Sequence, residues 1–175
     1  IYDNKIIAWF QGRMEYGPRA LGNRSILANP LNKNIKNIVN SRIKFRENFR
    51  PFAPVIRFKD IKKFISQSNI DITPTKFMLM VLKFKKKWHH LLPSVVHVDG
   101  TGRFQIIDRN INQNYYDLIT EFGKISGIPI LLNTSLNVKG EPICCSIDDA
   151  YNFFVKTDID YLVLENYLIK KNKII

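Results

Sequence analysis

The sequence predicts an α/β domain built on a twisted, mixed sheet with flanking helices. Two apolar segments, residues 6–10 and 128–132, have the length and composition of buried strands. Apolar residues recur at helical spacing in the segments 34–43 and 115–125. Strands that alternate with helices along a chain pack as helices on a sheet. The 175 residues, 45% of them hydrophobic, are enough for one core, so we expect a single domain over 1–175.

In the first part of the chain, a helix and an extended segment follow the opening strand. The helix at 34–43 would bury one apolar face and place Lys44 at its C-terminal end. After it, Pro51 and Pro54 enforce an extended path, because proline disfavours the helical conformation of the residue before it. This path leads into a predicted strand at 55–56.

The sequence of the middle of the chain predicts short helices, loops and strands around one buried strand. We expect a short helix at 60–65 and a polar loop at 66–74. The apolar run 77–82 predicts a buried strand, and the basic stretch 83–90 predicts a helix or loop at the surface. Residues 95–107 contain two strand-like runs on either side of a glycine-rich turn, which predicts a hairpin.

The last part of the chain predicts a helix, a central strand, a second helix and a closing hairpin. The helix at 115–125 is stopped by Gly-Ile-Pro, and the strand at 128–132 is apolar enough to be buried on both faces. Residues 146–149 have the pattern of a capping box. The hairpin is expected at 160–169. The apolar stripe expected on the second helix consists of Ile147, Ala150, Tyr151, Phe154 and Val155.

Residues 12–25 have the sequence GRMEYGPRALGNRS, with three glycines, one proline and three arginines. The glycines permit sharp turns and a close backbone approach to a ligand, and guanidinium groups bind anions through paired donors. This composition predicts an anion-binding loop, and a surface turn with solvated arginines explains it equally well. A second cluster at 44–54, where cations alternate with aromatics, favours the anion-binding interpretation.

The composition indicates an anionic partner and a reducing compartment. The formal net charge of +12 suits phosphate-bearing substrates or nucleic acid, although a biased genome composition also explains the excess of lysine. The apolar runs are far shorter than the ~18 residues of a membrane helix, and no signal-peptide pattern opens the chain. Cys144 and Cys145 are adjacent, which disfavours a disulfide and gives no zinc-ligand spacing. We therefore expect a cytoplasmic protein without a membrane partner.

Four blocks of sequence occur in the order and spacing of one known family. They are GRMEYGPRALGNRSILA at 12–28, FRPFAP at 49–54, HVDGTGR at 97–103 and LLNTSLNVKGEPI at 131–143. Together they resemble the C-terminal domain of the NodU/CmcH/TobZ family of O-carbamoyltransferases. Asn29 and Leu136 depart from the family pattern, in which Asp and Phe are usual, and this bears on substrate preference more than on reaction type.

The resemblance implies a YrdC-like fold that makes carbamoyl-adenylate from carbamoyl phosphate and ATP. In such enzymes an N-terminal domain of the HSP70/actin-like ATPase type passes the carbamoyl group to a hydroxyl of a small-molecule acceptor, whose identity the sequence does not give. That N-terminal domain is absent from these 175 residues, so we expect the chain to be an excised C-terminal domain. Its expected partner is the N-terminal domain of the same full-length chain. The chemistry needs positioning and electrostatic stabilisation rather than a nucleophilic side chain.

By the resemblance, Arg19, Lys44, Arg50 and Arg103 are the catalytic residues. Arg19 and Arg50 are expected to bind carbamoyl or phosphate oxygens through paired donors, and Lys44 to bring a compact charge to the phosphates. Arg103 would complete the pocket with the substrate-binding residues, which are Asn133, Thr134, Ser135, Arg24, Ser25 and Asn137. The last three of these are second choices, better suited to shaping the loop.

Mg²⁺ is expected to enter with ATP and to be held mainly by its phosphates. Glu15 and Asp99 are the motif carboxylates that we place near it, and the ligands are otherwise unknown. His97 and Asp99 share one face of a predicted strand. A metal pair is one interpretation, and a hydrogen-bonded or substrate-positioning role agrees better with the sequence.

Two other functions stay open at this point. A YrdC-like fold offers a basic concave surface that suits RNA, which predicts an affinity that falls steeply with salt. The aromatic residues lie mostly within apolar runs, and this argues against base stacking and so against a nucleic-acid partner. Alternatively, the isolated domain has only a non-catalytic interaction role, which predicts an exposed apolar patch.

Overall fold

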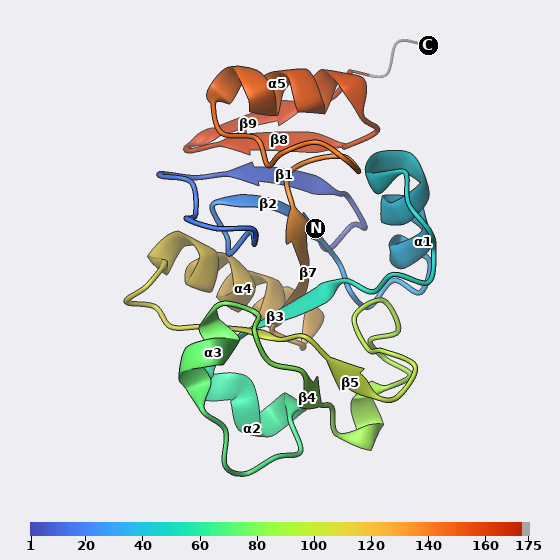
Figure 1. Ribbon diagram of the computed structural model, residues 1–175, viewed down its shortest axis with the longest axis vertical. Coiled ribbons are helices and arrows are strands. Elements are labelled where there is room, and N and C mark those ends of the chain that lie inside the picture. The colour runs from blue at the N-terminus through green and yellow to red at the C-terminus, as the bar shows by residue number, and fades with distance from the viewer. Residues whose placement is uncertain (173–175) are drawn as a thin grey trace.

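The computed structural model describes residues 1–172 and is organised around a seven-stranded mixed sheet (Figure 1). Across the sheet, the strands are β6 (Gln105–Ile107), β3 (Ala53–Arg57), β7 (Ile130–Ser135), β2 (Arg24–Ala28), β1 (Ile7–Phe10), β8 (Tyr161–Leu164) and β9 (Tyr167–Lys170). The central strand β7 is antiparallel to both of its neighbours, whereas β1 pairs with β8 and β3 with β6 in parallel. The predicted mixed sheet is confirmed.

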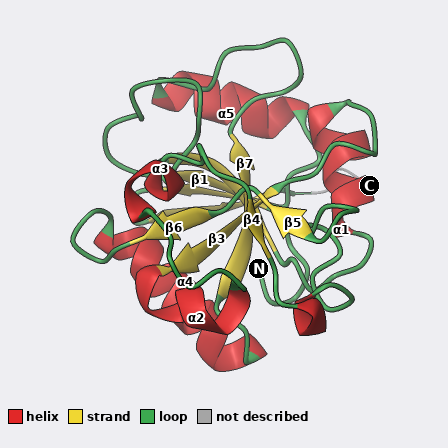
Figure 2. Cartoon of the chain, turned by 60° about the horizontal axis from the view of Figure 1, so that its bottom comes forward, coloured by secondary structure: helices red, strands yellow, loops and turns green. Residues whose placement is uncertain are grey.

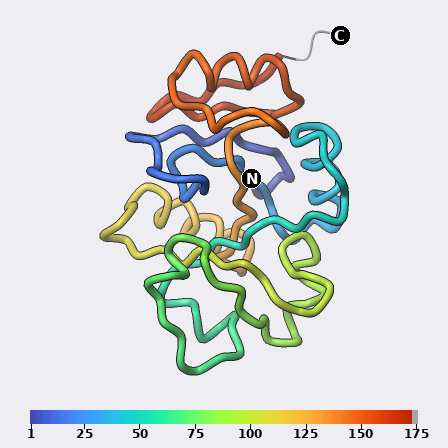
Figure 3. The backbone as a smooth tube through the Cα atoms, viewed as in Figure 1, coloured from blue at the N-terminus to red at the C-terminus, as the bar shows by residue number. Residues whose placement is uncertain are grey.

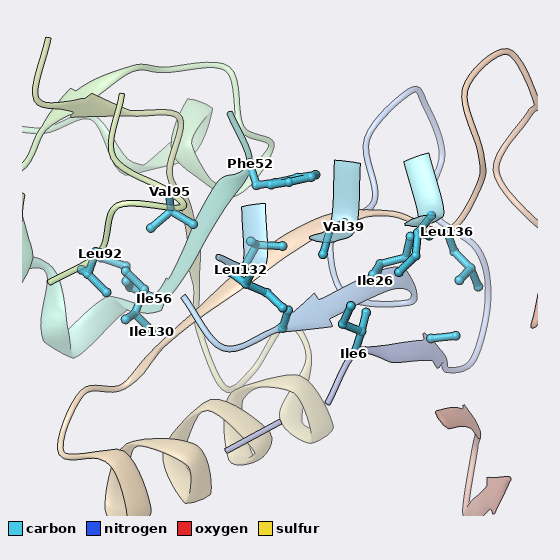
Figure 4. Packing of buried hydrophobic residues seen from close by; sticks show 14 of the residues in the cluster. Ile6, Ile26, Val39, Phe52, Ile56, Leu92, Val95, Ile130, Leu132 and Leu136 are labelled. Atoms are coloured by element: carbon cyan, nitrogen blue, oxygen red, sulfur yellow. The ribbon is translucent and has the colours of Figure 1, made fainter. Parts of the chain in front are cut away.

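Helices cover both faces of the sheet (Figure 2). On one face, α4 (Gln113–Ser126) packs against Leu131 of β7 and its neighbours. On the other face lie α1 (Ile35–Val39), whose Val39 shares a core with Leu132 (Figure 4), and α5 (Ile147–Lys156), which belongs to the same core. Because side chains alternate along a strand, β7 is buried on both faces, as its apolar sequence predicts.

Residues 58–102 form a smaller unit beside the sheet, drawn mainly in green in Figure 3. Its elements are the 3-10 helix η2 (Phe58–Asp60), α2 (Ile61–Phe64), α3 (Ile72–Lys76), β4 (Leu82–Lys83), the 3-10 helix η3 (Lys86–Trp88) and β5 (Thr101–Gly102). β4 and β5 pair as a small antiparallel sheet. Two aromatic pairs fill its interior, Phe64 against Trp88 and Phe84 against Phe104, with ring centroids 4.9 and 4.4 Å apart.

The buried strand predicted at 77–82 is wrong. The predicted loop before it contains α3, which begins after Asp71 because the carboxylate of Asp71 accepts a hydrogen bond from Thr73 N at 3.0 Å. The chain then turns at Met78, whose φ is +57°, and leaves Leu79 exposed. Only Leu82 of the run joins a strand. An apolar run of this length also fits a helix end and a turn. Here the cap at Asp71 sets where α3 begins, so the run falls at the end of that helix and in the turn after it.

The hairpin predicted across 95–107 is also wrong. β5 pairs with β4, and β6 pairs in parallel with β3, so the two runs belong to different sheets. His97 lies in a turn rather than in a strand, with Gly100 N donating to His97 O at 2.9 Å. Non-local strand pairing has overridden the local alternation, which carries no information about the partner strand.

The first flanking helix ends in a single π-helical turn, η1 (Asn40–Lys44). Phe45 follows in the left-handed conformation, with φ +47°. The helix predicted at 34–43 is therefore confirmed, and it delivers Lys44 at its end as expected. α4 also ends as predicted, because Gly127 takes the left-handed conformation with φ +75°.

The second flanking helix, α5, begins with the predicted capping box of Ser146 and Asp149. Its apolar stripe is only partly correct, because the buried face consists of Ala150, Phe153 and Phe154. The other predicted members of the stripe, Ile147, Tyr151 and Val155, are more than half exposed. The closing hairpin of β8 and β9 is confirmed. No helix within residues 1–172 is long and apolar enough to cross a membrane.

Candidate functional site

One edge of the large sheet collects the motif residues. The registers place Phe10 beside Arg24, Ser25 beside Ser135, and Ala53 beside Asn133. The carboxyl ends of β1 and β7 therefore meet the amino ends of β2 and β3, and the amino end of β6 lies next to β3. In open α/β sheets, ligands bind at such an edge, outside the carboxyl ends of strands.

Four arginines gather at this edge, Arg19, Arg46, Arg50 and Arg103. Burial and the charges of Arg19 and Arg50 lower the pKa of Arg103. Burial and the charges of Arg50 and Arg103 lower the pKa of Arg46 to about 10. None of the four forms an ion pair within residues 1–172. Like charges that lie together without ion pairs favour the binding of an anion.

The arginines differ in how freely they can reach a ligand. Arg19 and Arg50 are exposed, and Arg103 is half-buried with its Nε shielded from solvent and without a hydrogen-bond acceptor. Arg46 donates from Nε to Asn40 Oδ1 at 2.7 Å and stacks over the Phe52 ring at 4.7 Å. Arg19, Arg50 and Arg103 are thus the members with free donors.

Lys44 lies beneath this arginine cluster rather than on its surface. Its side chain is buried, and Nζ donates to Ser135 O and Asn137 Oδ1 at 2.7 Å and to Asn137 O at 2.8 Å. Burial, reinforced by the charges of Arg46 and Arg50, lowers its pKa to about 7. Lys44 therefore holds the loop after β7 in place instead of projecting a free ammonium towards a phosphate.

Glu15 and Arg24 fix the conformation of the 12–25 loop. Glu15 Oε1 accepts hydrogen bonds from the backbone N–H groups of Leu21 and Asn23 at 2.6 and 2.7 Å. Arg24 is buried over the Phe10 ring, 3.4 Å from its centroid, and donates to four backbone carbonyls, those of Gln11, Gly12, Asn23 and Cys145. Arg24 and Glu15 Oε1 are engaged within the protein and shape the loop, and Glu15 Oε2 is buried without a hydrogen-bond partner.

Gly22 allows the same loop to press against α4. Its φ is +112°, and a Cβ at this position would lie 2.1 Å from the Tyr115 ring. Trp9 Nε1 donates to Gly22 O at 2.8 Å, and Gly22 N donates to Ser25 Oγ at 3.1 Å. Ser25, predicted as a second-choice substrate ligand, is fully buried and supports the turn.

Two buried amides hold the backbone next to Arg19. Asn133 Nδ2 donates to Ala20 O at 3.0 Å and to Gln105 Oε1 at 2.8 Å, and Gln105 Nε2 donates to Leu21 O at 2.7 Å. Asn133 is only 1% exposed, so it anchors the loop from below. Of the three polar residues at the end of β7, only Thr134 and Ser135 reach the surface.

Sequence reasoning missed Arg46 and Gln105. Arg46 stands two residues after Lys44 in a cluster already singled out, so the alternation of cations and aromatics could have identified it. Gln105 carries no sequence signal, because its role depends on the pairing of β6 with β3.

The two candidate metal carboxylates do not form a metal site. Glu15 Oε1 is occupied by backbone donors, and Asp99 Oδ1 accepts from both N and Oγ1 of Thr101 at 3.0 and 2.7 Å. Within residues 1–172, no group of three or more His, Cys, Asp or Glu side chains could hold a metal ion. These residues therefore do not fit a protein-bound cation at this edge.

A cavity of about 550 Å³ opens between Phe45, the loop around Pro142 and α5. Its walls include Glu141, Asp149 and Lys156, and none of the four clustered arginines lines it. The cavity is therefore separate from the arginine cluster at the sheet edge.

Comparison with known proteins identifies the family of this chain. The sequence model of the family described as Carbamoyltransferase C-terminus matches residues 1–171. Nodulation protein NolNO of Sinorhizobium fredii is 47% identical over 171 residues, which are 98% of this chain and 25% of that protein. Nodulation protein U of the same species is 42% identical over 137 residues, 78% of this chain and 24% of that protein. The chain thus spans about a quarter of either relative.

Among solved structures, full-length HypF in its phosphate- and nucleotide-bound form resembles this fold with a TM-score of 0.60. The sequence identity is 21%, and the match covers 94% of this chain and 23% of HypF. The likeness shows a shared HypF-like α/β fold. Because the family match covers nearly the whole sequence, the chain belongs to the carbamoyltransferase C-terminus family.

Proposed function

We propose that this chain binds carbamoyl phosphate and ATP at the arginine-lined sheet edge and forms carbamoyl-adenylate. The observation that carries this proposal is the cluster of Arg19, Arg46, Arg50 and Arg103, whose charges perturb one another and which form no ion pair in the described part of the chain. Two polyanionic substrates repel each other, so a site that assembles them needs unpaired cations at one place.

The reaction balances when one water molecule takes part. Water takes the phosphoryl group of carbamoyl phosphate, which leaves carbamate and phosphate. A carbamate oxygen then attacks the α-phosphorus of ATP, and pyrophosphate departs. Both steps transfer a phosphorus centre between oxygens, where catalysis depends on positioning and on neutralising charge.

The free donors suggest a division of roles. Arg19 and Arg50 are exposed guanidinium groups that suit paired hydrogen bonds to phosphate oxygens, and the half-buried Arg103 would act from the floor of the site. Thr134 and Ser135 offer hydroxyl groups at the end of β7. Lys44 and Asn137 set the position of Ser135 from beneath.

A structural comparison supports this proposal. HypF, which shares the fold, was solved with phosphate and nucleotide bound.

Mg²⁺ would enter with the ATP phosphates, because Glu15 Oε1 and Asp99 Oδ1 already accept hydrogen bonds within the protein. We further propose that an N-terminal domain passes the carbamoyl group to an acceptor hydroxyl, since the relatives are three to four times longer than this chain.

Pyrophosphate release tests the proposal directly. The purified chain is supplied with ATP, Mg²⁺ and carbamoyl phosphate, and each substrate is omitted in turn. Release that needs both substrates supports carbamoyl-adenylate formation. Release with ATP alone would show a different reaction, and absence of both release and ATP binding would refute the proposal.

A further inference from the structure

A rigid turn holds His97 beside the arginine cluster. His97 N donates to Thr101 O at 2.7 Å and Gly100 N donates to His97 O at 2.9 Å, which closes the turn. Gly100 has φ +79°, and a Cβ on it would lie 2.4 Å from the His89 ring. The turn is thus closed by backbone hydrogen bonds and packed against His89, and it leads through β5 directly to Arg103.

Hydrogen bonds within this turn assign the tautomer of His97. Thr101 Oγ1 lies 2.7 Å from Asp99 Oδ1 and 3.0 Å from His97 Nδ1. Hydrogen bonds from the Thr101 side chain and backbone hold the pKa of Asp99 below its usual range, so this carboxylate is ionised and can only accept. The single hydroxyl proton of Thr101 goes to Asp99, and Oγ1 must accept from Nδ1–H of His97.

The other ring nitrogen of His97 is consequently an acceptor. A neutral imidazole carries one N–H, so Nε2 presents a lone pair. Burial lowers the pKa of His97 despite the opposing charge of Asp99, and the charges of Arg103 and Lys36 act in the same direction as burial. Within residues 1–172, Nε2 has no hydrogen-bond partner and is not among the buried unpaired atoms, so it is open to solvent.

A solvent-accessible acceptor is scarce at this sheet edge. The guanidinium groups of Arg19, Arg50 and Arg103 are donors only. Glu15 Oε1 accepts from the backbone at 2.6 Å and Glu47 pairs with Lys139 at 2.9 Å, while Glu15 Oε2 and Asn133 Oδ1 have no hydrogen-bond partner but are shielded from solvent. A carbamoyl group differs in its demands from a phosphate, because its NH₂ is a donor and needs an acceptor.

We propose that His97 Nε2 accepts a hydrogen bond from the carbamoyl NH₂ and so distinguishes carbamoyl phosphate from other acyl phosphates. Thr101 and Asp99 are positioning residues, because they fix the imidazole tautomer without touching the substrate. This inference rests on the proposed function of the same site. A site built to pair with an N–H discriminates well against an analogue that lacks it.

Acetyl phosphate is the probe that isolates this contact. It carries the same phosphate group, with CH₃ in place of NH₂. Its affinity and that of carbamoyl phosphate are measured by calorimetry for wild type, His97→Leu, His97→Gln and Thr101→Val, with His90→Leu as control. His90 is an exposed histidine with no side-chain hydrogen bond in the described part of the chain.

Wild type and His90→Leu should prefer carbamoyl phosphate, and His97→Leu should lose about tenfold in affinity for it while acetyl phosphate binds as before. His97→Gln should recover part of the preference through its amide oxygen, and Thr101→Val should lose part of it. An equal loss for both ligands, or no loss, would overturn the assignment of His97. Absence of carbamoyl phosphate binding to wild type would instead refute the proposed function, and this inference with it.

Discussion

Lys44 Nζ lies 2.7 Å from Asn137 Oδ1, so a buried ammonium ties the end of η1 to the loop that follows β7. The same nitrogen reaches Ser135 O at 2.7 Å. Two segments more than 90 residues apart in sequence are thus joined at one atom directly below the arginines. The protonation state of Lys44 should therefore depend on both folding and ligand binding.

The first prediction concerns stability and pH. The pKa of Lys44 is about 7 in the folded chain against a usual value of 10.5. Between these values the unfolded chain holds a proton that the folded chain lacks, so the free energy of unfolding should rise with pH, by at most about 1.4 kcal/mol per pH unit. Urea unfolding at several pH values should show this slope in wild type and in Lys33→Met, an exposed control, and a smaller slope in Lys44→Met. Identical slopes in all three would contradict the assignment.

The second prediction concerns protons taken up on binding. An anion at the arginine cluster stabilises the charged form of Lys44 and raises its pKa from about 7. Near pH 7, binding of sulfate, which does not itself titrate in this range, should therefore be accompanied by uptake of part of a proton. Calorimetry in two buffers of different ionisation enthalpy measures this directly. Equal observed enthalpies in the two buffers would show that Lys44 does not sense the ligand.

The third prediction separates a steric clash from backbone strain. Gly22 and Gly17 both have positive φ, +112° and +116°, but only Gly22 faces the Tyr115 ring. Gly22→Ala should therefore be less stable than Gly17→Ala by roughly 1–3 kcal/mol, the usual cost of overpacking a core. Urea unfolding of the two variants provides the comparison. Equal stabilities would mean that Tyr115 moves aside and does not hold the loop.

The fourth prediction tests the amide pair below Arg19. Gln105→Leu would leave Leu21 O without its donor and Asn133 Nδ2 with one acceptor fewer. We expect a loss of about 1–3 kcal/mol in stability, because buried polar groups become unpaired. Phosphate affinity should fall as well, since the backbone next to Arg19 loses its anchor. Gln113→Leu, at an exposed position of α4, serves as control and should change neither quantity. Unchanged phosphate affinity in a destabilised Gln105→Leu would restrict Gln105 to a purely structural role.

Local signals in the sequence predicted the elements whose ends they define. The capping box at Ser146 and the stop at Gly127 were both confirmed, because each involves residues within one or two helical turns. β7 was confirmed for a similar reason, since burial on both faces requires an unbroken apolar run. The same reasoning failed at 77–82, where a helix cap and a turn use an equally apolar sequence.

The site could be predicted only as a set of residues. The motifs identified Arg19, Arg50 and Arg103, and the registers of β2, β3, β6 and β7 bring them to one edge. The role of each residue depends on how deeply its side chain is buried, and the motifs alone do not give this. Lys44 and Asn133 lie beneath the surface and organise other residues, and Gln105 became visible only through the pairing of β6.

The rate of pyrophosphate release in Arg50→Gln, compared with Arg42→Gln, tests the central claim most directly. Arg50 belongs to the cluster and lowers the pKa of both Arg46 and Arg103, whereas Arg42 is an exposed arginine of η1 outside it. With ATP, Mg²⁺ and carbamoyl phosphate present, Arg50→Gln should slow release by about 10²-fold, as expected for a lost transition-state donor, and Arg42→Gln should match wild type. Equal rates in the two variants would contradict the assignment of the arginine-lined sheet edge as the site of the reaction.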